Sequence, residues 1–271
     1  MIHRIENKKV QAVLKNETIE LPFELKTKIN ENFEYMKSQG ANIWNGDVLC
    51  VSRCDINDND VKIICKKSDY AHYLYGERIG CPKEYECKNL SAGCLLETID
   101  GYYIVGELDE DTSYPTMLQV TGGGIDKDDI SEGIINIENT IIREAREELN
   151  IDLDNEKEIL YNKLSYIHIP NEDERSGVQL FSKAKMQMTA KEMENHFNNY
   201  YNYLKQNSLE IEFKKLHFLK KESAIEELMR LNNPKRNYLV PLIQMDLKEI
   251  KIMEDIMKYL RISDINVLYK D

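Results

Sequence analysis

Three glutamates, Glu144, Glu147 and Glu148, stand close together near the middle of the chain. The segment after Asn136 has helical periodicity, so side chains three and four positions apart share a face, with Cβ atoms about 5–6 Å apart. Such a group of carboxylates suits a hard divalent cation, because Mg²⁺ prefers oxygen ligands. The alternative is a solvated, glutamate-rich helix, and the spacing alone leaves both interpretations open.

The elements around this helix must fix its rotation. An apolar stripe at close to 3.6-residue spacing predicts that one side is buried and that the glutamates face the other way; it consists of Ile137, Ile141, Ile142, Ala145 and Leu149. Three consecutive glycines, Gly122, Gly123 and Gly124, precede the helix and permit positive φ and close backbone approach. We therefore expect a strand over 117–120, a glycine loop and then the helix.

Residues 143–151, REAREELNI, resemble the second half of a Nudix box, whose pattern is G-x5-E-x7-R-E-U-x-E-E-x-G-U with U aliphatic. Arg143 and the three glutamates fall in place, and Asn150 replaces the last glycine, since asparagine also adopts the left-handed conformation. The first half departs from the pattern. Fourteen residues before Arg143 stands Asp129 where the family has glycine, and eight before it stands Ile135 where the family has glutamate.

The first half of the box is therefore lengthened. If Gly124 is the family's glycine, the interval to Arg143 is 143 − 124 = 19 residues, about five more than in the pattern. Glu132 or Asp129 would then replace the missing acid.

The resemblance implies a function. In Nudix hydrolases the box helix holds Mg²⁺ or Mn²⁺, which bridges to a diphosphate while water attacks phosphorus. By this resemblance Glu144, Glu147 and Glu148 are metal ligands, Arg143 orients a box carboxylate, and the three glycines shape the catalytic loop. The expected substrate is a small nucleoside diphosphate linked to a group X. The competing hypothesis is a non-catalytic ligand-binding or regulatory module whose stretched box has lost its metal geometry.

The chain has 271 residues and a mass of 31.8 kDa, which suits two modest domains. We expect an N-terminal accessory domain over 1–90, of α+β type with a helix and a β-hairpin, and a Nudix domain over 91–271. The fold class implied is α/β (α+β), with a mixed β-sheet between helices.

The N-terminal part contains a predicted helix over 20–39, then a hairpin of strands 47–56 and 61–67. The Asn45-Gly46 turn and the Asp69-Tyr70 helix start resemble the Nudix subgroup of UDP-glucose hydrolases. This resemblance favours a sugar as X, while dinucleotides, ADP-ribose and coenzyme A derivatives stay open.

The C-terminal part alternates strand and helix signals. Strands are predicted over 91–99 and 102–108 as a hairpin, and over 158–169, 178–186 and 210–219. Helices are predicted over 190–206, over 222–231 with a capping box of Ser223 and Glu226, and from Asp246 with Glu249 to about Leu260. Aromatic residues of the first of these helices can serve as core or as a stacking surface, and core is favoured; they are Phe197, Tyr200, Tyr201 and Tyr203.

The acidic loop 170–177 follows a predicted strand after the box. In Nudix folds such a loop often faces the site, so Glu172, Asp173 or Glu174 could supply a further acid or a general base. The alternative is a solvated turn.

Composition excludes several partners. The chain carries 36 Lys+Arg against 48 Asp+Glu, a net charge of −12, without a basic run, so long nucleic acids are not expected partners. No stretch approaches 18 apolar residues and the N-terminus lacks a signal-peptide core, which predicts a cytoplasmic protein without a membrane span. The sequence leaves a homodimer open.

Six cysteines lie between Cys50 and Cys94 and invite a zinc or disulfide interpretation. No C-x2-C pair is present, and a cytosolic chain keeps its thiols reduced, so ordinary half-buried thiols are favoured.

Overall fold

The computed structural model describes residues 1–40, 43–171, 174–175 and 177–260. A large mixed sheet forms the centre of the molecule, with the strand order β1-β11-β12-β5-β6-β13, β7 beside β6 and β8 beside β5. The bounds are Ile2–Arg4 for β1, Ile159–His168 for β11, Val178–Met186 for β12, Leu90–Glu97 for β5, Tyr102–Leu108 for β6, Phe213–Lys220 for β13, Leu118–Gln119 for β7 and Thr121–Gly124 for β8.

Helices cover both faces of this sheet. Helices α3 (Ile137–Leu149) and α4 (Ala190–Gln206) contribute to one buried cluster, while α5 (Ala224–Arg230) and α6 (Leu239–Leu260) contribute to another. All eight residues of β5 are buried because successive side chains enter opposite clusters, as Leu95 and Leu96 do. The predicted α+β fold, a mixed sheet between helices, is confirmed.

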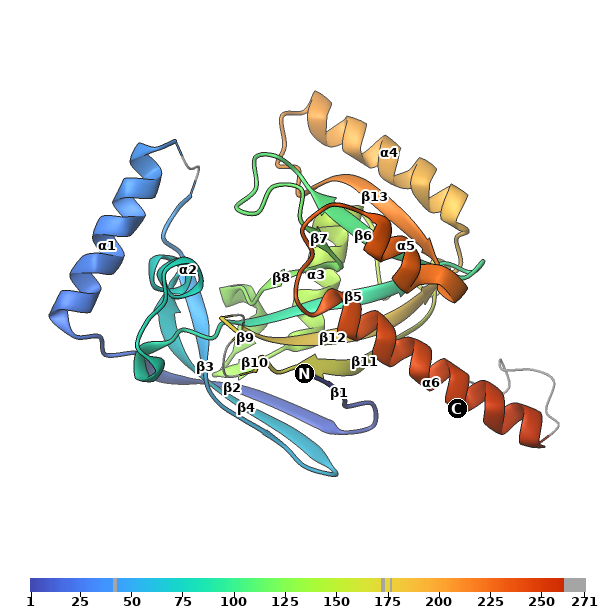
Figure 1. The fold of residues 1–271 in the computed structure, drawn as a ribbon, viewed down its shortest axis with the longest axis horizontal. Coiled ribbons are helices and arrows are strands. Elements are labelled where there is room, and N and C mark those ends of the chain that lie inside the picture. The colour runs from blue at the N-terminus through green and yellow to red at the C-terminus, as the bar shows by residue number, and fades with distance from the viewer. Residues whose placement is uncertain (41–42, 172–173, 176, 261–271) are drawn as a thin grey trace.

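A smaller sheet has the order β3-β4-β2-β10-β9. Its strands are Asp47–Ile56 (β3), Asp60–Asp69 (β4), Lys9–Thr18 (β2), Ile134–Ile135 (β10) and Ile130–Ser131 (β9). Helices α1 (Phe23–Ser38) and α2 (Tyr70–Arg78) pack together around Ile29, Phe33 and Leu74. Figure 1 shows α1 and α2 at one end of the molecule and α6 at the other. The predicted N-terminal helix and hairpin are confirmed.

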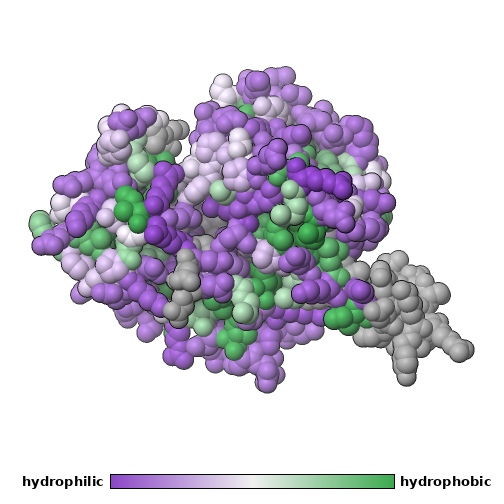
Figure 2. Space-filling model, in the orientation of Figure 1, coloured by the Kyte–Doolittle hydropathy of each residue, from purple (hydrophilic) through white to green (hydrophobic). Residues whose placement is uncertain are grey.

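Each of the two sheets contains strands from both the N-terminal and the C-terminal part of the chain. β1, from the start of the chain, pairs with β11 of the large sheet, whereas β9 and β10, from the lengthened box, extend the small sheet through β2. Each sheet thus contains strands from both predicted ranges, and the division at residue 90 stays a prediction. In the described part of the chain, no helix combines the length and apolar character that a membrane crossing requires. The face shown in Figure 2 is mostly hydrophilic.

The predicted hairpin of β5 and β6 is only partly formed. The turn is present, with Gly101 at φ 84°, but the strands pair only at Glu97 and Tyr103. Beyond that point β5 pairs with β12 and β8, while β6 pairs with β7 and β13. Two apolar runs flanking a turn do not reveal which strands pair further along the sheet.

Two predictions about C-terminal helices are wrong, one on a capping box and one on a helix start, although Ser223 does stand at the N-cap of α5 as predicted. The Ser223 hydroxyl donates to the carboxylate of Glu227 and makes no cap to the backbone, so no capping box with Glu226 forms. The last helix starts at Leu239 and not at Asp246, although it does reach Leu260. The side chain of Glu249 lies outside the described part.

Asp246 is instead fully buried in the middle of α6. Its carboxylate accepts hydrogen bonds from the hydroxyls of Tyr103 and, at 2.7 Å, Tyr166, and it lies 2.6 Å from the ammonium group of Lys183. Two phenols and an ammonium group compensate for the removal of this charge from water. The acid that resembled a helix cap therefore attaches α6 to the sheet.

We expect Asp246→Asn to lower the free energy of unfolding by roughly 3–5 kcal/mol, because it breaks a buried ion pair. The amide keeps an acceptor for one tyrosine but removes the negative charge opposite Lys183. Urea unfolding monitored by circular dichroism measures the change, with Asp154→Asn on the exposed surface as the control. Equal stability of the two variants would contradict the role given to Asp246.

Candidate active site

Helix α3 is capped by an asparagine at each end, Asn136 and Asn150. The Asn136 side chain accepts a hydrogen bond from the Asn139 amide at 3.2 Å, and Asn150 ends the helix at φ 54°, in the left-handed region. Both features agree with the sequence analysis. The apolar stripe is buried, with Ile142 only partly so.

The three glycines form strand β8 and not the predicted loop. They pair with residues 91–93 of β5, and Gly122 has a φ of +145°. A Cβ on Gly122 would lie 2.4 Å from the carbonyl oxygen of Ala92 and 2.4 Å from the Cα of Gly93. Because only a glycine permits this approach, the sequence correctly signals close contact, but the partner is a strand.

Glu148 faces β8 instead of solvent. It is buried, and its Oε2 accepts hydrogen bonds from the Thr121 hydroxyl and, at 2.9 Å, from the Gly122 amide. Burial raises the pKa of the Glu148 carboxyl, and the nearby acids Glu144 and Glu212 raise it further. The prediction that the glutamates lie opposite the buried side is therefore wrong for Glu148, which α3 presses against the glycine strand.

Arg143 connects the other acids of the box. Its guanidinium donates to Glu144 at 2.8 Å, to Glu147 at 3.0 Å, to the carbonyl of Gly124 at 3.0 Å and to Asp129 at 3.1 Å. Glu144 is mostly buried and Glu147 is 60% exposed. A planar group with several fixed donors suits such multiple pairing.

The lengthened part of the box is a short hairpin preceded by a 3₁₀ turn over Lys127–Asp129. Glu132 and Gly133, both at positive φ, form its turn, and Glu132 is exposed. Asp129 is buried and also accepts from Thr140 at 2.8 Å. Of the two acids that the sequence left open, Asp129 is the one that reaches Arg143.

A further acid, Glu212, lies near the box carboxylates. It precedes β13, its pKa is raised by burial, and its charge raises the pKa values of both Glu144 and Glu148. Burial raises the pKa of Glu144 to about 7, against the opposing effect of Arg143. Sequence reasoning missed Glu212, and nothing in its local sequence marks it.

Of the three candidate acids in the acidic loop, only Glu174 lies in the part of the chain that the structure describes, and its recorded contacts are within and beside the loop. Glu174 accepts from the amide of Asn171 at 2.8 Å and lies 3.8 Å from the ring of His168. Neither partner belongs to the box. Glu172 and Asp173 lie outside the described residues.

Helix α4 packs on the C-terminal end of α3. Phe197 is buried, and the Tyr200 hydroxyl donates to the carbonyl of Glu147 at 2.8 Å. Tyr201 packs partly against the same core, while Tyr203 is 55% exposed. The favoured core role thus holds for Phe197 and in part for Tyr201.

Whether this site fits a metal ion depends on its donors. Within the described ranges, no group of three or more His, Cys, Asp or Glu side chains is arranged to hold one. Arg143 draws Glu144 and Glu147 together, whereas Glu148 hydrogen-bonds only neutral donors, both through Oε2. The donor set is nevertheless chemically suitable for Mg²⁺, since it consists of carboxylates, and among the described residues the buried Glu148 is bound by a hydroxyl and a backbone amide, without a cation.

The glycines provide a test of this arrangement. A Cβ on Gly123 would lie 2.5–2.7 Å from the carboxylate of Glu144, so Gly123→Ala should displace that flexible side chain at little cost in stability. Gly122→Ala meets backbone at a positive φ and should lower the melting temperature by several degrees. We expect Gly123→Ala to melt within about 2 °C of the wild type and to lose about tenfold in hydrolysis rate. Thermal melts and rate measurements check both, and the reverse pattern would contradict the assigned contacts.

No protein-family model matches the sequence, and no curated protein matches it significantly. Similar solved structures include a MutT protein from Methanosarcina mazei Go1, at 12% identity and a TM-score of 0.38 over 60% of this chain and 94% of that one. An Ap4A hydrolase from C. elegans has 14% identity and a TM-score of 0.35 over 60% and 97%. A NUDIX hydrolase from Nitrosomonas europaea has 14% identity and a TM-score of 0.37 over 59% and 88%. Each of these likenesses is one of fold alone, with a TM-score below 0.4.

Proposed function

We propose that the chain is a Nudix-type pyrophosphohydrolase that uses Mg²⁺ or Mn²⁺ to hydrolyse a nucleoside diphosphate linked to a group X. The observation that carries the proposal is the box helix held against β8, with Glu144 and Glu148 buried beside the glycines and Arg143 joined to the other acids. A merely solvated, glutamate-rich helix would not bury two of its carboxylates.

Glu144, Glu147 and Glu148 would hold the cation. When bound, it supplies positive charge to the phosphates and lowers the pKa of water. To bind the cation, Glu144 and Glu147 must give up at least some of their hydrogen bonds to Arg143. The flexible side chain of Arg143 can move to permit this. Glu212 is then a candidate for a fourth acid, either as a ligand or as a general base.

Arg143 serves as a positioning residue. Asp129 and the carbonyl of Gly124 hold one side of its guanidinium, and the other side pairs with Glu144 and Glu147. This arrangement orients two carboxylates before a substrate arrives. Thr121 and Gly122 do the same for Glu148 through neutral donors.

A sugar is the favoured group X. The support is the resemblance of the N-terminal part to UDP-glucose hydrolases, carried by two dipeptides that lie together in the fold. The Asn45 side chain accepts from the Ala71 amide at 2.8 Å, and the Tyr70 amide donates to the carbonyl of Gly46 at 2.9 Å. Asp69 caps α2 through the amide of His72.

The test is hydrolysis of a panel of diphosphates with Mg²⁺ or Mn²⁺, followed by ³¹P NMR. The panel contains nucleoside diphosphate sugars, dinucleoside polyphosphates, ADP-ribose and coenzyme A. We expect metal-dependent cleavage at the anhydride, with the highest kcat/KM for a nucleoside diphosphate sugar. A higher kcat/KM for another compound of the panel would identify a different group X and would leave the proposed hydrolase activity in place.

A non-catalytic module is the second candidate function. The observation that favours it is the pairing of Arg143 with Glu144 and Glu147, which leaves no ready group of three acids among the described residues. Calorimetry with the same compounds separates the two functions. Binding without cleavage at any metal concentration would favour the module.

A further inference from the structure

Tyr114, in the loop between β6 and β7, lies against two arginines from distant parts of the chain. The guanidinium carbon of Arg236 is 4.2 Å from the centre of its ring, and that of Arg78, at the end of α2, is 5.8 Å away. Arg78 also donates to the carbonyl of Ser113 at 3.1 Å, and the Tyr70 hydroxyl lies 3.0 Å from the hydroxyl of Ser113. Figure 1 shows this loop, in green, extending toward the end of the molecule that carries α1 and α2.

The positive charges of the two arginines are only partly compensated. Arg236 has the carboxylate of Glu77 at 3.9 Å, and burial raises the pKa of Glu77, which favours its neutral form. Arg78 donates to the sulfur of Met36 and to a backbone carbonyl, and in the described part of the chain no carboxylate lies within 4 Å of it. Arg78 is exposed and the side chain of Arg236 is 22% exposed, so an anion can reach both.

Two polar atoms of the same cluster lack partners. The Oε2 atom of Glu77 and the hydroxyl oxygen of Tyr114 are buried, and neither has a hydrogen-bond partner among the described residues. Tyr73 donates to the other oxygen of Glu77 at 3.1 Å. Folded proteins pair nearly all buried polar atoms. The hydrogen bonding of this cluster is therefore incomplete without a further polar group.

The strand that leads into the glycines connects Arg236 with the box. The Nε atom of Arg236 donates to the side chain of Gln119 at 3.2 Å. Alternate residues of a strand share a face, so Gln119 lies on the side where Thr121 donates to Glu148, about 7 Å further along. The charge of Arg236 also opposes the rise that burial causes in the pKa of Glu212. The arginine cluster thus adjoins the box acids.

We propose that Arg78 and Arg236 bind an anionic group carried by X, so that the substrate is a nucleoside diphosphate linked to a sugar acid and not to a neutral sugar. The inference rests on the proposed hydrolase function and specifies its group X. With the diphosphate at the box acids, a substituent of X at a distance of about 7 Å meets the arginines. Arginine suits this task because its planar group of donors matches a carboxylate, and Tyr114 supports the plane of the guanidinium.

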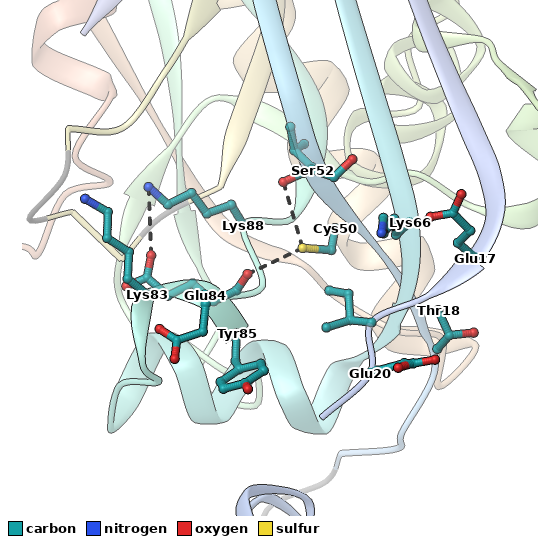
Figure 3. A pocket seen from close by; sticks show the side chains of 13 residues that line it. Glu17, Thr18, Glu20, Cys50, Ser52, Lys66, Lys83, Glu84, Tyr85 and Lys88 are labelled. Atoms are coloured by element: carbon teal, nitrogen blue, oxygen red, sulfur yellow. Dashed lines mark hydrogen bonds and ion pairs between the residues drawn. The ribbon is translucent and has the colours of Figure 1, made fainter. Parts of the chain in front are cut away.

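Another lysine-rich surface of the N-terminal part differs from this cluster. Figure 3 shows the lining of a cavity of about 680 Å³, which includes Lys66 and Lys88. Lys66 is 2.9 Å from Glu17, and Lys88 is 4.0 Å from Glu86, so both have acids of the same cavity as partners. Lys66→Gln therefore serves as the matched control for the loss of one positive charge.

The experiment compares UDP-glucuronate with UDP-glucose, two probes that differ only in a carboxylate or a CH₂OH group on the sugar. We expect a kcat/KM at least about tenfold higher for UDP-glucuronate, the scale of one hydrogen bond to a charged group. Arg78→Gln and Arg236→Gln should each reduce this ratio to about twofold or less, mainly through a higher KM for the acid. Arg78→Lys should keep part of the preference, because it keeps the charge, and Lys66→Gln should keep all of it.

Arg78→Gln is the more informative variant, because Arg78 is exposed, whereas loss of Arg236 leaves Glu77 without its cation. Calorimetry with Ca²⁺ in place of Mg²⁺ gives a readout that does not depend on cleavage. UDP-glucuronate should bind at least about tenfold more tightly than UDP-glucose, and Arg78→Gln should remove the difference. Such binding without cleavage under Mg²⁺ would contradict the hydrolase function and retain the anion site.

Equal kcat/KM and equal affinity for the two sugars in the wild type would overturn the anion site, even if both sugars are cleaved and the hydrolase function stands. A preference for the acid that survives in both Arg78→Gln and Arg236→Gln would overturn it as well. So would the absence of binding and of cleavage for both compounds.

Discussion

We expect Glu148→Gln to lower the rate of the proposed Mg²⁺-dependent diphosphate hydrolysis by at least about a hundredfold, and Glu147→Gln to do the same. The physical reason is common to both: a neutral amide binds a divalent cation far more weakly than a carboxylate, so stabilisation of the charge that develops in the transition state is lost. The measurement is kcat/KM over a range of Mg²⁺ concentrations, for a substrate identified with the panel.

The two glutamates differ in environment, which makes the pair informative. Glu148 is buried and accepts from Thr121 and Gly122, whereas Glu147 is 60% exposed and pairs with Arg143. A rate loss caused by damage to the fold would affect Glu148→Gln much more than Glu147→Gln. A loss of the same size in both, with unchanged circular dichroism, points to the cation they would share.

Glu138→Gln is the matched control, because this residue is exposed in the first turn of the same helix. It should retain full activity. Folded variants of Glu147 and Glu148 that keep the wild-type rate would remove the metal assignment and leave the non-catalytic module as the better function.

The sequence predicted α3 well because its determinants are local. A stripe of apolar residues, a capping asparagine at 136 and an asparagine able to adopt positive φ at 150 specify its limits without help from the rest of the chain. The glycines, in contrast, predict a loop, since three glycines in a row have no strand preference. Their pairing with β5 is a tertiary effect, and it also turned Glu148 inward.

Long-range contacts account for the other differences. Asp246 looks like a helix start, but Tyr103, Tyr166 and Lys183 meet it in the core from positions 143, 80 and 63 residues earlier in the chain. Glu212 approaches the box only because β13 joins the sheet beside β6. No pattern in the local sequence indicates the contacts of Asp246 or the position of Glu212.

The lengthened box shows the limit of motif counting. Spacing alone left Asp129 and Glu132 as equal substitutes for the missing acid. The extra residues fold into β9 and β10, which pair with β2 and point Glu132 to the surface, whereas Asp129 remains below α3 beside Thr140. The insertion therefore joins the small sheet to the candidate site and fixes which acid Arg143 meets.

Asp129→Asn should therefore lower kcat/KM by about tenfold to a hundredfold, the range typical of residues that orient metal ligands. The amide can still accept from Thr140, so the loop should keep its fold, but it loses the charge that holds Arg143 at 3.1 Å. With that anchor weakened, Arg143 binds Glu144 and Glu147 in more than one arrangement, and the carboxylates are less well prepared for the cation.

Two readouts separate positioning from a general structural effect. The Mg²⁺ concentration for half-maximal activity should rise, and high Mg²⁺ should restore part of the rate to Asp129→Asn but not to Glu148→Gln, which lacks a ligand. Arg143→Lys should resemble Asp129→Asn, because an ammonium group keeps the charge but cannot reproduce the four contacts of the guanidinium. Glu132→Gln, in the exposed turn of the same hairpin, should have no effect. If Glu132→Gln reduced the rate as much as Asp129→Asn, Asp129 would have no special part in orienting Arg143, and the hairpin as a whole would be the element on which activity depends.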